Sequence, residues 1–427
     1  MATDVERLEV LDVLRGWALC GLFFVHMLES YEIFWAEPHY EFATKVVFLL
    51  FSGKCFAILA LCFGFSFYML VDRHGPPNAA ASLCYLRRLI ILGAFGVIHS
   101  MLYRGDILVL LALLGAPLLF VSRVKSNAVL ISIAAILFLQ PPIMFDLFMA
   151  PGSGAAAAAY RDVSMSVYQH GGFAEVLRTN MWDGQIPKWI FMVESGRLLQ
   201  AAGLILCGVV LGRRGFFKHL ATTGRVQLML LFGAVLAAGI LHYWQKPLVD
   251  LGCRGGMSCE TALGTLVQGW TQLVMTLGWV LAVCAVWVRF DRTLLRPFSF
   301  LGRATLSFYV LQSIVFVPLF YHFGAGLAEV LSPADRLVGA GAGALVQLWL
   351  ATVWFKHFAY GPLEWVWRAL TQGNWDVPFH RAGQPTPALR AQALGVEPAN
   401  EAHLPAQAPM ALLRRPADQA CSTILRR

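Results

Sequence analysis

Apolar residues recur along this chain in blocks of about 20, separated by short polar connections. A helix needs about 20 predominantly apolar residues to cross the hydrocarbon core of a bilayer. Charged residues make up only 14% of the chain, whereas soluble globular domains carry about 25%. The chain therefore lacks the polar surface that a water-soluble fold requires. The pattern predicts an all-α, polytopic membrane helix bundle.

The number of apolar blocks predicts about ten transmembrane helices. We place them at residues 9–29, 46–71, 83–102, 106–122, 127–149, 188–211, 225–244, 262–288, 298–322 and 336–358. Together they define one transmembrane domain, residues 1–372. The following segment, residues 373–427, is rich in Ala, Pro, Gln and Arg and has no apolar periodicity. Such a composition favours disorder, so we expect a disordered tail.

Lys and Arg residues concentrate in every second connection between the predicted spans. They are Arg73, Arg87 and Arg88, then Arg123 and Lys125, then Arg213, Arg214, Lys218 and Arg225, and finally Arg289, Arg292, Arg296 and Arg303. Cytoplasmic loops carry such an excess of Lys and Arg. This pattern places both termini in the cytoplasm. It also accounts for the formal net charge of +8 without nucleic-acid binding.

Two further features concern the ends of the spans. The first ten residues have no cationic region or cleavage signal, so the first block is expected to be a retained helix and not a signal peptide. The connection 245–261 holds Cys253 and Cys259 on the side of the membrane where disulfides form. A bridged and an unbridged pair are both open. The sequence shows no metal-ligand cluster and does not indicate an oligomeric state.

The first predicted span carries two ionisable residues, Arg15 and His26, eleven positions apart. Eleven residues make three helical turns plus about 20°, so both side chains project from one face, separated by about 16.5 Å along the axis. Arg suits phosphate recognition and His suits general-base catalysis. Arg15 could instead reach the headgroups or pair with Asp12, and His26 could be a polar contact between helices. Spacing alone leaves both interpretations open.

The segment Leu11 to Leu19 (LDVLRGWAL), followed by His26, resembles the first helix of the family-three membrane acyltransferases. That family has an Arg, ten residues and then a His. The resemblance implies that Arg15 binds an acyl donor and that His26 is catalytic. The LDVLRG motif also resembles heparan-α-glucosaminide N-acetyltransferases.

The rest of the chain looks more like the YeiB-like bacterial membrane proteins, whose domain has unknown function. The matching stretches are Gly105–Leu108 (GDIL), Gly208–Phe216 (GVVLGRRGF), Gly302–Ser313 (GRATLSFYVLQS) and Gly361–Thr371 (GPLEWVWRALT). The most specific part is 208–372. The position of His26 is commonly Asn in these proteins, so the catalytic implication is less direct there. The resemblance implies a multi-pass protein of the bacterial cytoplasmic (inner) membrane.

Three other groups of charged residues are candidates for function. His99, Arg104 and Asp106 bracket a tight turn between the third and fourth spans, so a two-His catalytic site with Asp106 as orienting partner is one reading; helix capping by Asp106 is the other. Glu194 and Arg197 are three residues apart and are expected to form a buried ion pair. Arg87, Arg88 and Arg303 are candidates for binding the phosphates of coenzyme A, or serve only to orient the protein.

The sequence thus favours an acyltransferase that moves an acyl group from cytoplasmic acyl-coenzyme A, its co-substrate, to a hydroxyl or amine. The acceptor is expected to be an envelope or glycan-type molecule. The alternatives are a transporter of a small polar solute, whose buried charges would line a substrate path, and a non-catalytic membrane partner.

Overall fold

The computed structural model describes residues 8–72, 77–149, 163–220, 223–253 and 257–380. Within these ranges the regular structure is helical, apart from one isolated bridge between Phe358 and His380. The predicted all-α fold class is confirmed. The helices are α1 (Glu9–Leu28), α2 (Phe42–Leu50), α3 (Lys54–Leu70), α4 (Ala79–Leu102), α5 (Leu108–Gly115), α6 (Leu118–Val121), α7 (Asn127–Leu139), α8 (Pro141–Met149), α10 (Phe173–Met181), α11 (Gln185–Glu194), α12 (Arg197–Arg213), α13 (Gly224–Gly252), α14 (Met257–Arg289), α15 (Arg292–Arg303), α16 (Thr305–Phe320), α17 (Pro333–His357) and α18 (Pro362–Gln372).

Six helical segments of the described chain are long and apolar enough to cross a membrane, and up to eight if each bent helix pair counts as one span. The two bent pairs are α11–α12, with an angle of 66°, and α15–α16, with an angle of 77°. Two further predicted spans, 106–122 and 127–149, correspond to the shorter apolar segments Leu108–Val121 and Asn127–Leu139. The membrane character of the chain follows from these helices, while the count of ten and the orientation of the termini stay predictions.

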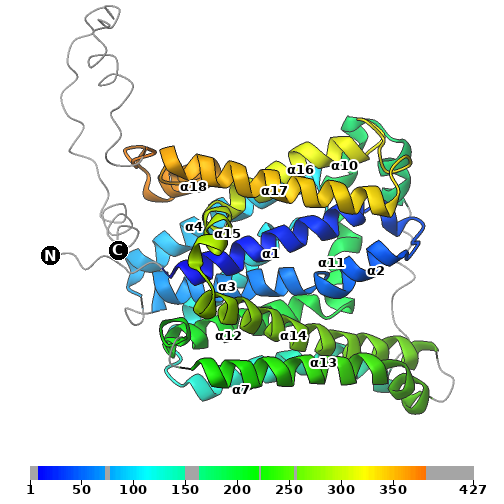
Figure 1. The fold of residues 1–427 in the computed structure, drawn as a ribbon, viewed down its shortest axis with the longest axis horizontal. Helices are drawn as coiled ribbons and strands as arrows, with labels where there is room; N and C mark the ends of the chain where they lie inside the picture. The colour runs from blue at the N-terminus through cyan, green and yellow to red at the C-terminus, as the bar shows by residue number, and fades with distance from the viewer. Residues whose placement is uncertain (1–7, 73–76, 150–162, 221–222, 254–256, 381–427) are drawn as a thin grey trace, which may run out of the picture.

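Helix α1 runs through the centre of the bundle (Figure 1), where it packs against α15, α3 and α17. Its most apolar window is 83% buried, whereas that of α13 is only 11% buried. Helix α13 pairs with α14 at one side of the bundle. Asp12 and His26 on α1 are therefore buried in protein, while an apolar residue on α13 is free to face lipid.

Glycines allow two pairs of helices to touch backbone to backbone. On α1 and α15, a Cβ added to Gly16 would lie 2.0 Å from the carbonyl oxygen of Phe298. On α3 and α12, a Cβ added to Gly64 would lie 1.9 Å from the carbonyl oxygen of Ile205, and one added to Gly208 would lie 2.1 Å from that of Leu61. Small residues allow such close approach in membrane helix bundles. These two crossings fix how α1, α3 and α12 surround the polar residues described below.

Cys253 and Cys259 form a disulfide with a Cα–Cα distance of 5.6 Å. It closes the connection between α13 and α14, so the bridged alternative is the one that the structure contains. Residues 373–380, which begin the predicted tail, are ordered against α17 and α18: the Trp365 indole donates to the carbonyl of Val377, and the amide of Ala359 donates to that of Phe379. Residues 381–427 lie outside the described residues.

Glu364 joins α18 to the N-terminus of α16 and lies outside the candidate spans. Its carboxylate accepts hydrogen bonds from the amides of Leu306 and Ser307 and from the Ser307 hydroxyl. Burial nevertheless raises the pKa of Glu364 above its ordinary value of 4.5, against the opposing effect of these hydrogen bonds. The folded state thus binds the proton more tightly than the unfolded chain does.

We expect this carboxyl group to lower stability as the pH rises above about 4.5 and through the raised pKa. The uncharged variant Glu364→Gln should therefore lose less of its melting temperature between about pH 5 and about pH 8 than the wild type does. Melting in detergent at several pH values measures the difference. Parallel curves for the two proteins would contradict the expectation.

Candidate functional site

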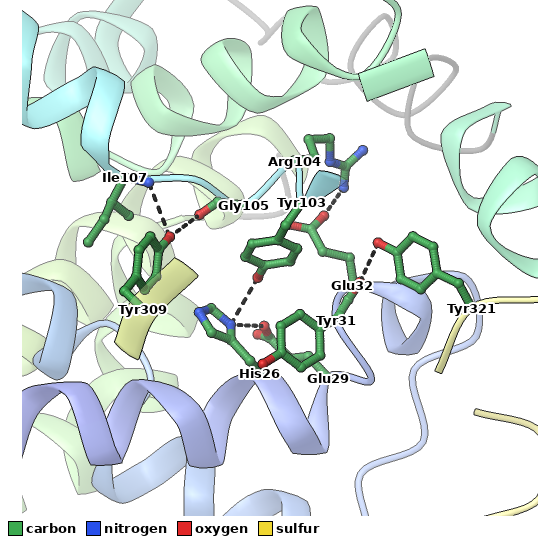
Figure 2. Close-up of polar contacts among 10 residues, drawn as sticks. All are labelled: His26, Glu29, Tyr31, Glu32, Tyr103, Arg104, Gly105, Ile107, Tyr309 and Tyr321. Carbon is green, nitrogen blue, oxygen red and sulfur yellow. Dashed lines mark hydrogen bonds and ion pairs between the residues drawn. The ribbon is translucent and has the colours of Figure 1, made fainter. Parts of the chain in front are cut away.

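The C-terminal end of α1 leads into a backbone segment of unusual conformation. Ser30, Tyr31 and Glu32 have φ angles of 46°, 51° and 88°. Such positive values are uncommon for residues other than Gly, and they cluster at functional sites when the surrounding structure holds them. Here the segment turns Tyr31 and Glu32 toward the loop that connects α4 to α5 (Figure 2).

His26 lies one turn before this segment and is 6% exposed. Its Nδ1 is 2.9 Å from the hydroxyl of Tyr103 and 3.9 Å from Oε2 of Glu29 (Figure 2). In the tautomer whose Nδ1–H donates to the Tyr103 oxygen, beside the Glu29 carboxylate, the lone pair of the ring stands on Nε2. Nε2 is buried and has no hydrogen-bond partner in the described protein. The imidazole can therefore act as a base toward a group that enters the site.

Glu32 and Arg104 form an ion pair beside His26 (Figure 2). Arg104 is 6% exposed and also lies 5.7 Å from the ring of Tyr168. The hydroxyl of Tyr321 donates to the carbonyl of Tyr31 at 2.8 Å. The hydroxyl of Tyr31 itself is buried without a partner, as is Nη1 of Arg104. Buried polar groups are nearly always hydrogen-bonded, so these two atoms have hydrogen-bonding capacity that the described residues leave unused.

His99 and Asp106 come together as the sequence predicts, and they meet a third residue that the sequence analysis did not select. His99 Nδ1 lies 2.8 Å from Oδ1 of Asp106, and His99 Nε2 lies 2.8 Å from the hydroxyl of Ser313 on α16. The other oxygen of Asp106 accepts from the amide of Val109 at 3.1 Å, in the first turn of α5. Asp106 therefore caps a helix and orients His99 at the same time.

Tyr103 lies between the two histidines. Its ring centroid is 5.0 Å from that of His26 and 6.1 Å from that of His99. Tyr309 closes the other side, with its ring centroid 4.8 Å from that of His99 and its hydroxyl 3.3 Å from the amide of Ile107. We call the set His26, Glu29, Tyr31, Glu32, His99, Tyr103, Arg104, Asp106, Tyr309 and Ser313 the two-histidine cluster.

A cavity of about 230 Å³ lies next to the positive-φ segment. Its lining includes Ser30, Glu37, Glu41 and Arg336. Ser30 is 1% exposed and its hydroxyl has no partner in the described protein. The two-histidine cluster therefore has a polar hollow beside it, on the side away from Arg15.

Arg15 lies at the other end of α1, where it pairs with Asp12 at 2.9 Å and donates to the Ser66 hydroxyl at 2.5 Å. Pairing with Asp12 was one of the two interpretations that the sequence left open. On the helix stripe between Arg15 and His26, Leu19 and Leu22 are both buried in the core. The structure thus separates a cationic end from the two-histidine cluster by an apolar layer.

The other predicted donor-binding residues divide between two places. Arg88 stacks on Trp367, with the guanidinium carbon 3.7 Å from the ring centroid, and its charge interacts with those of Arg15 and Arg368. Arg87 is its chain neighbour on α4. Arg303 instead lies over Phe355 at 4.2 Å and donates to the carbonyl of Ala359 at 3.2 Å. Arg15, Arg88 and Arg368 therefore form one cationic group, and Arg368 was absent from the sequence-based set.

The prediction that Glu194 and Arg197 lie on one continuous helix is wrong. Helix α11 ends at Glu194, α12 begins at Arg197, and Gly196 between them has a φ of 68°. The guanidinium of Arg197 lies 4.9 Å from the ring of Phe191, and its charge interacts with those of Glu29 and Glu32. The break turns Arg197 toward the two-histidine cluster, while its ion pair with Glu194 stays a prediction.

Among the described residues, no group of three or more His, Cys, Asp or Glu side chains could hold a metal ion. The two histidines belong to separate hydrogen-bonded sets.

A helical membrane protein with a buried polar cluster beside its central helix is the class that fold and site define. Residues 211–374 match the family described as "Protein of unknown function (DUF418)". The chain is 28% identical to "Uncharacterized protein YxaH" of Bacillus subtilis, over 87% of this chain and 96% of that protein. It is 25% identical to "Uncharacterized protein YeiB" of Escherichia coli, over 86% of this chain and 97% of that protein.

A third relative, "Uncharacterized 39.9 kDa protein in amylase 3'region" of Bacillus acidopullulyticus, is 22% identical over 86% of this chain and 94% of that protein. No solved structure matches the chain. The predicted resemblance to YeiB-like membrane proteins is thus confirmed, and it extends over nearly the whole chain. The matched family region coincides closely with the stretch 208–372 that the sequence singled out.

Proposed function

We propose that this protein is a membrane-embedded acyltransferase of the bacterial inner membrane. It transfers an acyl group from cytoplasmic acyl-coenzyme A to a hydroxyl or amine of an envelope or glycan-type acceptor. The observation that carries the proposal is the buried, unpartnered Nε2 of His26, in a polar cluster where Nδ1 contacts the Tyr103 hydroxyl and lies near Glu29.

The cationic group at the opposite end of α1 supports an anionic donor. The charge of Arg88 interacts with those of Arg15 and Arg368. Guanidinium groups bind phosphate well because their donors are fixed in a fork. In the proposal the phosphates of coenzyme A bind there, and the uncharged arm of the donor extends past Leu19 and Leu22 toward His26. The axial separation of Arg15 and His26, about 16.5 Å, suits such an extended molecule.

In the proposed reaction the acceptor approaches through the cavity beside Ser30 and meets the thioester at the two-histidine cluster. His26 Nε2 takes the proton of the acceptor hydroxyl or amine as that atom attacks the thioester carbonyl carbon. Tyr103 and Glu29 hold the imidazole in the required tautomer. Arg104, with one unpartnered nitrogen, is the nearby donor suited to the negative charge that develops on the carbonyl oxygen.

The test is acyl transfer from radiolabelled acetyl-coenzyme A by purified protein in lipid nanodiscs, supplied with an extract of envelope lipids and glycans. His26→Ala should lower transfer by about 100-fold or more, the scale of a lost general base. Arg15→Ala should mainly raise the KM for acetyl-coenzyme A. His219→Ala is the control, because His219 is exposed in the connection between α12 and α13, and its Nδ1 contacts the carbonyl of Gly215. Normal transfer by His26→Ala would rule out the mechanism.

The two bent helix pairs favour a second candidate, a transporter of a small polar solute. Transporters place substrate at broken helices near the bilayer centre, and both Arg197 and Ser313 follow such a break here. Uptake of solute into vesicles, with no binding of coenzyme A, would identify this function in place of acyl transfer.

A further inference from the structure

Three buried residues form a connected line from carboxylate to imidazole to hydroxyl. Asp106 is 0% exposed, His99 4% and Ser313 1%. They come from the α4–α5 loop, from α4 and from α16, and the two contacts that link them both measure 2.8 Å. Hydrogen-bonding capacity fixes the direction of each bond. The carboxylate only accepts, so His99 Nδ1 carries the proton, and Nε2 accepts from the Ser313 hydroxyl.

The contact made by Ser313 differs from those of three other serines, Ser66, Ser100 and Ser122. Such hydroxyls commonly donate to a carbonyl one turn back in their own helix. Ser66 does so to Cys62, Ser100 to Val97 and Ser122 to Leu119. Ser313 instead donates to a histidine 214 positions away in the sequence. Helix geometry alone does not require this bond, and the bond polarises the hydroxyl toward loss of its proton.

Resting on the proposed acyltransferase function, we propose that Ser313 is the nucleophile of a covalent first step, with His99 as its base and Asp106 as the residue that positions His99. The arrangement of a hydroxyl, an imidazole and a carboxylate in line is the one that activates serine in acyl transfer on unrelated folds. This gives a chemical role to the sequence motif Leu311-Gln312-Ser313. Direct attack of the acceptor on the thioester would not use Ser313.

In the first step, Oγ of Ser313 attacks the thioester carbonyl carbon while its proton passes to Nε2 of His99. The carbon–sulfur bond then breaks, and the leaving thiolate takes that proton from His99, so free coenzyme A and an acyl-serine ester result. In the second step, the acceptor atom attacks the ester carbon and gives its proton to His26. The bond to Oγ breaks, and Oγ recovers the proton that His26 releases. No proton is gained or lost overall.

Both half-reactions use the surroundings of Tyr103. Its ring contacts the rings of both histidines, so the two bases flank one side chain, and in the proposal the acyl group is held beside it. A two-step reaction also explains why the cluster contains two histidines in separate hydrogen-bonded sets. His99 Nε2 contacts the Ser313 hydroxyl, whereas His26 Nε2 has no partner in the described protein.

The experiment uses radiolabelled acetyl-coenzyme A and the full-length protein in nanodiscs, without acceptor. We expect a burst of about one coenzyme A thiol released per active chain, and a stable acetyl group on the peptide that contains Ser313, identified by mass spectrometry. Ser313→Ala should abolish the label and lower transfer by about 100-fold or more. Ser100→Ala is the matched control, because it removes a buried serine next to His99 that bonds only locally, and it should keep label and transfer.

The variant Ser313→Cys distinguishes two roles of Ser313, that of a nucleophile and that of a hydroxyl that only stabilises the fold. It should regain part of the label, now as a thioester that neutral hydroxylamine cleaves, which a structural role would not produce. Wild-type transfer with no label, or full transfer by a folded Ser313→Ala, would overturn the acyl-serine while the proposed function stands. Absence of both label and transfer in the wild type, with any acceptor extract, would remove the proposed function together with this inference.

Discussion

Replacing Arg104 with methionine is expected to lower the free energy of unfolding by about 3–5 kcal/mol. The variant leaves the carboxylate of Glu32 without its partner in a position where water cannot replace it. Side chains of both residues are largely buried, with exposures of 7% for Arg104 and 15% for Glu32. Methionine matches the aliphatic stem of arginine, so the change removes the guanidinium while the packing of the stem is kept.

The double variant Glu32→Gln with Arg104→Met is the decisive comparison. It removes both charges, so it should recover a large part of the stability that the single variant loses. Thermal or denaturant unfolding in detergent gives the four values of the cycle. If Arg104→Met unfolds like the wild type, then Glu32 is solvated, and the two-histidine cluster is wetter than its burial indicates.

The fold was predictable because a helix that crosses the bilayer requires about 20 apolar residues in a row. Each of the ten apolar blocks has a helical counterpart in the described chain, and two of these counterparts are shorter apolar helices of 10–17 residues. The helix breaks were missed because a hydropathy window averages across them. The breaks lie at short polar segments, Glu194–Arg197 and Arg303–Thr305, between longer apolar flanks that dominate the mean hydropathy of the window.

The site was predictable only where its residues are near one another in the sequence. His99 and Asp106 are seven positions apart, and a turn between two spans necessarily brings them to one surface. Tyr103 is 77 positions from His26, and Ser313 is 214 from His99. Such pairs depend on which helices are neighbours, and hydropathy carries no information on that choice. Nothing in the sequence context of Glu32 points to Arg104.

Glycines determine which helices can pack closely against the central ones. Among substitutions of these glycines, we expect the largest loss of folded protein at Gly208. A side chain at this position would meet the backbone of α3, because an added Cβ would lie 2.1 Å from the carbonyl oxygen of Leu61 and 2.8 Å from the amide nitrogen of Phe65. Backbone atoms cannot rotate away as the end of a side chain can. Gly208→Leu must therefore separate α12 from α3.

We expect Gly208→Leu to yield no monodisperse folded protein on size-exclusion chromatography in mild detergent. Gly239→Leu is the matched control, since it places the same side chain on a long apolar helix where nothing lies within 4 Å of the added Cβ. It should purify and melt like the wild type. Helix α12 also carries Arg197 at its start, so separation of α12 from α3 moves that charge away from Glu29 and Glu32. A folded Gly208→Leu protein with wild-type stability would show that the α3–α12 contact is not the one that holds the bundle together.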